Sequence, residues 1–85
     1  MDEDFQRRLL ATFWLEAEEH LANITAGLIG LETSAAAEAG AETVETIFRE
    51  AHSLKGAARA VGLTEIEAIC RALEAVFEQR ATVGI

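Results

Sequence analysis

The sequence predicts an all-α protein, and three observations support that prediction. The chain of 85 residues contains no proline, is rich in alanine and has few runs of β-branched residues, a composition that favours helices over strands. Apolar residues recur every three or four positions along three long stretches, which is the period of an amphipathic helix. Turn-forming residues separate the stretches. A chain of this length supports one domain with a modest core.

The first predicted helix covers about residues 4–32. Acidic residues at 2–4 suit the positive end of its dipole. Leu10, Trp14 and Leu15 widen its apolar stripe, so we expect this helix either to contact two neighbours or to carry a patch that another chain covers. The stripe itself consists of Phe5, Leu9, Phe13, Ala17, Leu21, Ile24, Leu28 and Leu31.

A connection and a second helix follow. Residues 33–41 break the apolar period, and Gly40 is the strongest helix stop among them, so we predict that this segment reverses the chain. The second helix is predicted over about 42–60, with Gly62 as a left-handed cap at its C-terminal end. Its apolar stripe consists of Val44, Ile47, Phe48, Ala51, Leu54, Ala58 and Val61.

The third helix is predicted over about 64–80. Thr64 and Glu67 have the spacing of a capping box, which marks a helix start. Cys70 is the single cysteine, which excludes an internal disulfide, and its place on the apolar face predicts a small buried hydrophobic residue. The core face consists of Ile66, Ile69, Cys70, Leu73, Val76 and Phe77.

Charge and hydropathy exclude several functions. The formal charge is −8, from 15 acidic against 7 basic side chains, which argues against nucleic acid or an anionic membrane as the partner and leaves an acidic surface for a basic protein. Nothing resembles a signal peptide, and no apolar run approaches the ~18 residues of a membrane helix. We therefore expect a cytoplasmic protein without membrane insertion.

The most informative residue is His52, in the middle of the second predicted helix. Helical geometry places it roughly 100° from the centre of the apolar stripe, on the flank of the core. Gly56 lies one turn later on the same face, where a glycine costs about 1 kcal/mol relative to alanine but leaves room for another surface to approach. Lys55 lies on the neighbouring ridge. The spacing therefore predicts an accessible nucleophile beside a cation.

These residues resemble a known family. The run Ile-Phe-Arg-x-Ala-His-Ser-Leu-Lys-Gly-Ala-Ala around His52, closing on Val-Gly-Leu, is similar to the signature of histidine-phosphotransfer (HPt) domains, most closely those of CheA-type chemotaxis histidine kinases. Residues 13–32 resemble the family's first helix, and Leu73-Glu74 resembles the middle of its third. The resemblance covers most of the chain.

The resemblance implies an antiparallel helical bundle of the HPt type. Such domains have a four-helix body, to which the CheA type adds a fifth helix, whereas three helices are predicted here. We therefore expect that the fourth helix is missing or is supplied by a homodimer partner. Residues 1–85 would then form a single HPt-like domain, the N-terminal fragment of a larger kinase.

The resemblance also assigns roles at the site. His52 is the phosphoacceptor, and Glu74 accepts a hydrogen bond from its Nδ1 so that Nε2 points outward. Lys55 stabilises the charge of the phosphoryl group, and Gly56 leaves space for a partner to reach the imidazole. An imidazole suits this chemistry because its ordinary pKa of about 6.5 leaves a lone pair on one nitrogen near neutral pH.

Two arginines depart from the family pattern and are auxiliary candidates. Arg71 stands where chemotaxis members often have a second histidine, so we expect an altered hydrogen-bond network, although a cation there could still face a phosphate. Arg59 stands where a small residue is common, and it could bind the phosphoryl group or restrict which partner docks.

The function implied is that of a phosphocarrier in two-component signalling. His52 would accept a phosphoryl group from the ATP-binding domain of a histidine kinase and pass it to an aspartate of a response-regulator receiver domain. This chain has no Gly-rich phosphate loop, so we expect neither autonomous enzymatic activity nor a cofactor of its own, with ATP and Mg²⁺ bound by the partner domains.

Two alternatives belong to other classes. One is an inert helical interaction or dimerisation module with a vestigial HPt motif, which Arg59, Arg71 and the missing helix leave open. The other is a metal-dependent enzyme, which is disfavoured because His20 and His52 fall on different helices without a ligand cluster. His20 itself is predicted on a solvated helix face, among Glu18, Glu19 and Asn23.

Overall fold

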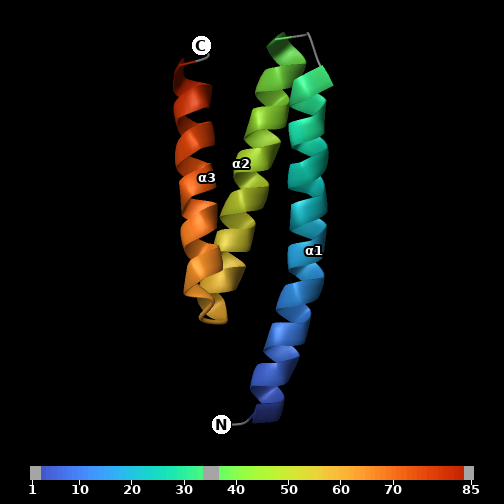
Figure 1. The fold of residues 1–85 in the computed structure, drawn as a ribbon, viewed down its shortest axis with the longest axis vertical. Helices are drawn as coiled ribbons and strands as arrows, with labels where there is room; N and C mark the ends of the chain where they lie inside the picture. Colours follow the sequence, from blue (N-terminus) through green and yellow to red (C-terminus); the bar gives the residue numbers. More distant parts are fainter. Residues whose placement is uncertain (1–2, 34–36, 84–85) are drawn as a thin grey trace.

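The protein is a chain of three antiparallel helices. The computed structural model describes residues 3–33 and 37–83, with side chains for 3–33 and 40–78, and these residues are helical apart from one turn at 61–63. Figure 1 shows that α2 lies between the other two helices and that the N-terminal end of α1 projects beyond the α2–α3 turn. The helices are α1 (Glu3–Thr33), α2 (Ala37–Ala60) and α3 (Thr64–Val83). The all-α prediction with three helices is confirmed.

The core consists of two clusters stacked along α2. Each cluster takes side chains from all three helices, although no described Cα of α1 lies within 8 Å of α3. Cys70 is 1% exposed, as its apolar position predicts. The cluster near the α2–α3 turn contains Phe13, Ala17, Leu54, Ala58 and Cys70. The cluster toward the opposite end contains Ile24, Val44, Ile47, Ala51 and Phe77.

A glycine allows α1 and α2 to approach closely. A Cβ at Gly27 would lie 2.7 Å from Cγ1 of Ile47, a separation that only a shift of the packed side chain could relieve. Ile47 is fully buried. Gly27 therefore sets the spacing of the two helices, a role that the sequence pattern did not reveal.

The turn between α2 and α3 is fixed by Gly62. Its φ of 77° is in the left-handed region, as predicted for a cap. The N–H of Leu63 donates to the carbonyl of Ala58 at 2.9 Å, and the N–H of Gly62 donates to the carbonyl of Arg59 at 3.2 Å. This pair of bonds is a Schellman motif. Leu63 also packs against the core, so both hydrogen bonds and apolar contact fix the direction in which α3 leaves.

The predicted start of the second helix was wrong. Gly40 is inside α2, which begins at Ala37 rather than near residue 42, while residues 34–36 of the predicted connection lie outside the described residues. The penalty for a helical glycine is only about 1 kcal/mol, and its alanine neighbours favour the helix. A Cβ at Gly40 would be 3.9 Å from Leu31, so α2 packs against the end of α1 from its first turns.

The predicted capping box is also wrong in its details. The N–H of Glu67 donates to the carbonyl of Leu63 at 3.0 Å, which makes Leu63 the N-cap and Thr64 the first helical residue. Glu67 is thus one position too late to close the box, and its carboxylate binds arginines instead. At the other end, α3 continues to Val83, three residues past the predicted end.

Large apolar side chains remain exposed on α1 and α3. Trp14 is about half exposed, which is the second of the two outcomes expected of the broad first stripe. The prediction of Ile69 and Val76 on the core face was wrong, because their side chains are 62% and 59% exposed. No described helix combines the length and the apolar character needed to cross a membrane. The exposed set is Phe5, Leu9, Trp14, Leu15, Leu21, Leu28, Ile29, Ile69 and Val76.

Candidate functional site

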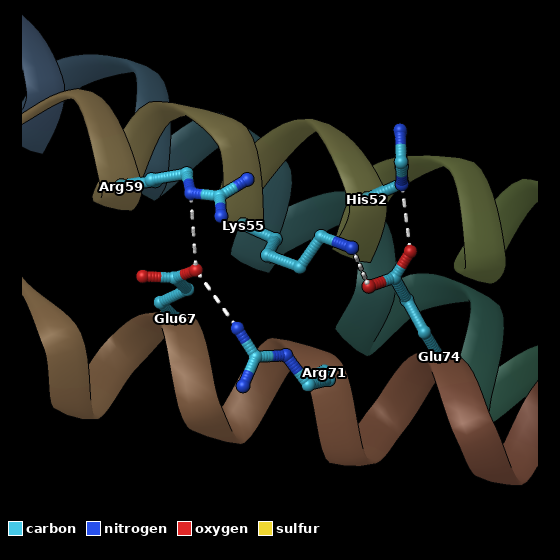
Figure 2. Close-up of polar contacts among 6 residues, drawn as sticks. All are labelled: His52, Lys55, Arg59, Glu67, Arg71 and Glu74. Atoms are coloured by element: carbon cyan, nitrogen blue, oxygen red, sulfur yellow. Dashed lines mark hydrogen bonds and ion pairs between the residues drawn. The ribbon is translucent and has the colours of Figure 1, made fainter.

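The α2–α3 turn determines which side chains meet across the two helices. In an antiparallel pair, residues at equal distances from the turn lie at the same level. His52 and Glu74 are each 11 residues from Leu63, and Arg59 and Glu67 are each four residues from it. Both pairs are in contact (Figure 2). The register that Gly62 fixes therefore builds the site.

His52 and Glu74 form the central contact. Nδ1 of His52 lies 2.7 Å from Oε2 of Glu74. An ionised carboxylate can only accept, so Nδ1 carries the hydrogen and donates it. In the neutral ring the lone pair is then on Nε2, which Figure 2 shows on the side of the ring away from Glu74. The side chain of His52 is 64% exposed, so this nitrogen is open to a partner.

Lys55 keeps Glu74 ionised. Its Nζ lies 2.7 Å from Oε1 of Glu74, whose side chain is only 10% exposed. Burial by itself would raise the pKa of Glu74, but the contacts with Lys55 and His52 and their charges outweigh burial and hold the pKa below its ordinary value. Glu74 is therefore a carboxylate at neutral pH, and this fixes the tautomer of His52.

The surroundings of His52 leave its outer face clear. Phe48, one turn earlier on α2, lies parallel to the imidazole with ring centroids 6.3 Å apart. Gly56, one turn later, is exposed, and a Cβ at this position would meet nothing within 4 Å. The fold of the chain therefore does not require a glycine at 56, and the open space beside His52 is available to a partner.

The two arginines meet at a second carboxylate. Oε2 of Glu67 lies 2.9 Å from Nη2 of Arg71 and 3.5 Å from Nε of Arg59. The side chain of Glu67 is 13% exposed, whereas both arginines are largely exposed. Figure 2 shows these three side chains beside His52 and Glu74, with Lys55 between the two sets.

A second histidine–carboxylate pair was not predicted. Nδ1 of His20 lies 2.8 Å from Oε1 of Glu50, which also accepts a 3.1 Å bond from Asn23. His20 is 22% exposed, so the prediction of a solvated face was wrong. The hydrogen bond from His20 lowers the pKa of Glu50. The pair joins α1 to α2, and its long sequence separation gave no local signal.

The predicted site residues therefore fall into two adjacent groups. His52, Lys55 and Glu74 are in direct contact, with Gly56 beside them. Arg59 and Arg71 belong to the Glu67 group, and Glu67 was not predicted as a site residue. Among the described residues, no group of three or more His, Cys, Asp or Glu side chains is placed to hold a metal ion.

Comparison with known proteins agrees with this geometry. The sequence matches the Hpt domain family over residues 8–84. The chain belongs to the HPt domain family. This HPt domain is also 35% identical over 66 residues, 78% of the chain, to the chemotaxis protein CheA of Rhizobium meliloti (strain 1021). The matched region spans 8% of the length of that relative. No solved structure shows significant similarity. Family membership supports a phosphocarrier role in a His–Asp phosphorelay.

The lowered pKa of Glu74 predicts a loss of stability in acid. Because the folded-state pKa is below the ordinary value of 4.5, the stabilisation is complete above that value and is lost as the pH falls through the folded-state pKa. We expect Glu74→Gln to be less stable than wild type at neutral pH, with the difference shrinking below pH 4.5. Thermal unfolding by circular dichroism as a function of pH measures it.

The pH dependence of stability in Glu50→Gln is the comparison. Glu50 also has a lowered pKa, so the same direction of change is expected, but Glu50 lies between α1 and α2 and not beside His52. A difference between Glu74→Gln and wild type that does not change with pH would contradict the assignment of Glu74 as an ionised group.

Proposed function

We propose that this HPt domain carries a phosphoryl group between the ATP-binding domain of a chemotaxis-type histidine kinase and an aspartate of a response-regulator receiver domain. His52 is the acceptor. The observation that carries the proposal is the 2.7 Å bond from Nδ1 to a buried carboxylate, which leaves Nε2 as an exposed nucleophile. ATP and Mg²⁺ bind to the partner domains.

The first transfer uses the lone pair of Nε2. It attacks the γ-phosphorus of ATP, a bond forms between nitrogen and phosphorus, and the bond from the γ-phosphorus to the bridging oxygen breaks as ADP leaves. The ring gains positive charge because Nδ1 keeps its hydrogen. Glu74 opposes that charge at a distance of 2.7 Å, as carboxylates do for other catalytic histidines.

The second transfer reverses these changes at nitrogen. A carboxylate oxygen of the receiver aspartate attacks phosphorus, an acyl phosphate forms, and the nitrogen–phosphorus bond breaks with its electron pair returning to Nε2. Lys55, one turn from His52, supplies positive charge near the phosphoryl group in both directions and holds Glu74 between transfers. Gly56 allows both partners to approach the imidazole.

The two histidines of the chain provide a direct test. Incubated with the core of a chemotaxis-type histidine kinase and labelled ATP, the wild-type domain is expected to take up acid-labile, base-stable label. His52→Gln should take up none, whereas His20→Gln, which alters the other histidine–carboxylate pair, should resemble wild type. Glu74→Gln should lower the rate by roughly one to two orders of magnitude, the loss typical when the outer partner of a metal-bound histidine is removed.

Label that persists in His52→Gln would contradict the assignment of the acceptor. If the wild-type domain takes up no label while circular dichroism shows it to be helical, the inert interaction module becomes the better description.

We also propose that a second copy of residues 1–85 covers the exposed apolar surface of α1 formed by Trp14, Leu21 and Leu28. Each copy presents the same surface, so a twofold axis can bring two of them together. Trp14 and Leu21 are central to it and about half exposed. We expect sedimentation to give the mass of a dimer for wild type and of a monomer for Leu21→Glu.

Leu15→Glu is the matched control. Leu15 was counted in the broad stripe on sequence grounds and is also exposed, but it lies about 120° around the helix from Leu21 and so outside this surface. A wild-type monomer at all concentrations, or equal behaviour of the two variants, would contradict the dimer.

A further inference from the structure

The surface beside His52 differs in charge from the rest of the molecule. The chain has a net charge of −8, yet three of its seven basic residues, Lys55, Arg59 and Arg71, lie together along one side of the α2–α3 hairpin. Arg59 and Arg71 have side chains that are 75% and 65% exposed. The net charge of the whole chain favours a basic partner, whereas the surface around Lys55, Arg59 and Arg71 favours an acidic partner.

In this arrangement the two arginines pair with Glu67 and not with the residues that contact His52. Arg59 is seven residues after His52, which is about 10 Å along the helix at 1.5 Å per residue. Its Nε faces Glu67, on α3 at the same level of the hairpin. Arg71 also faces Glu67, four residues earlier on its own helix and thus away from Glu74. The guanidinium groups lie to one side of the reacting atoms.

Glu67 gives the arginines a defined position. One carboxylate, mostly buried, contacts two guanidinium groups from different helices, and their combined charge remains positive. Holding the side chains in place reduces the conformational entropy that a partner would otherwise have to overcome on binding. Arginine forks of this kind suit bidentate contacts with carboxylates.

We propose that Arg59 and Arg71, held by Glu67, form a docking site for acidic side chains that surround the phosphoryl-accepting aspartate of the receiver domain. This inference rests on the proposed function. An acceptor that binds Mg²⁺ needs further carboxylates near its aspartate, because Mg²⁺ prefers oxygen ligands. A nucleotide site instead needs cations for its phosphates, and would be repelled by this surface. The arginines therefore favour docking of the receiver domain over docking of the ATP-binding domain.

The test compares two pairs of arginines. The double variant Arg59→Gln/Arg71→Gln removes the docking site, and Arg7→Gln/Arg8→Gln removes the same charge from an exposed part of α1. Binding of an unphosphorylated, purified chemotaxis-type receiver domain is measured by calorimetry at several salt concentrations. We expect the first variant to bind about fivefold or more weakly and with less dependence on salt, and the control to change less than twofold.

Loading with phosphoramidate separates this inference from the proposed function. This small donor transfers its phosphoryl group to Nε2 with loss of ammonia and needs no docking surface. If the wild-type domain takes up no phosphoryl group from phosphoramidate, the proposed function fails whatever the binding data show. If the docking variant loads at the wild-type rate, binds weakly and transfers slowly to the receiver, the inference holds.

Equal binding by the two double variants would overturn the inference. A docking variant that binds normally but loads slowly would also overturn it, because the arginines would then act on the phosphoryl group. Circular dichroism checks that each variant is folded, and the single variants Arg59→Gln and Arg71→Gln repeat the comparison if the double variant loses helicity.

Discussion

The antiparallel register of α2 and α3 is the constraint on which the site depends. Gly62 has a backbone conformation that other residues rarely adopt, and the Schellman bonds leave α3 one direction in which to return. That register brings Glu74 level with His52 and Glu67 level with Arg59. Neither pair could form from one helix alone. A shift of α3 by a single residue would rotate both carboxylates away from their partners by about 100°.

The contacts of Glu74 with Lys55 and His52 keep this buried carboxylate ionised, so that it can accept a hydrogen bond from His52. Glu74 is almost completely covered by protein, and an unpaired carboxylate in such a place would tend to take up a proton. Lys55 and His52 each contact one of its oxygens and keep it charged. The same ion pair that stabilises the hairpin therefore selects the tautomer of His52. In this way, a structural contact determines which nitrogen can react.

Much of the structure could be predicted from local patterns. The apolar period gave three helices, and Gly62 was recognised as a cap because its role depends only on nearby residues. Gly40 was misread because α1 packing against α2 outweighs a small local preference. The His20–Glu50 pair and the close approach at Gly27 depend on residues far apart in sequence, so no local pattern could reveal them. The contact between His52 and Glu74 was expected only through resemblance to a family.

The most direct test of the account is the tautomer of His52, read from long-range correlations between ring protons and nitrogens in NMR spectra at mildly alkaline pH. The account predicts hydrogen on Nδ1 and a bare Nε2 in wild type, and loss of that preference in Glu74→Ala. His20 in the same spectra provides an internal reference. Hydrogen on Nε2 of His52 in the wild-type domain would contradict the account, because the exposed nitrogen would then have no lone pair with which to accept a phosphoryl group.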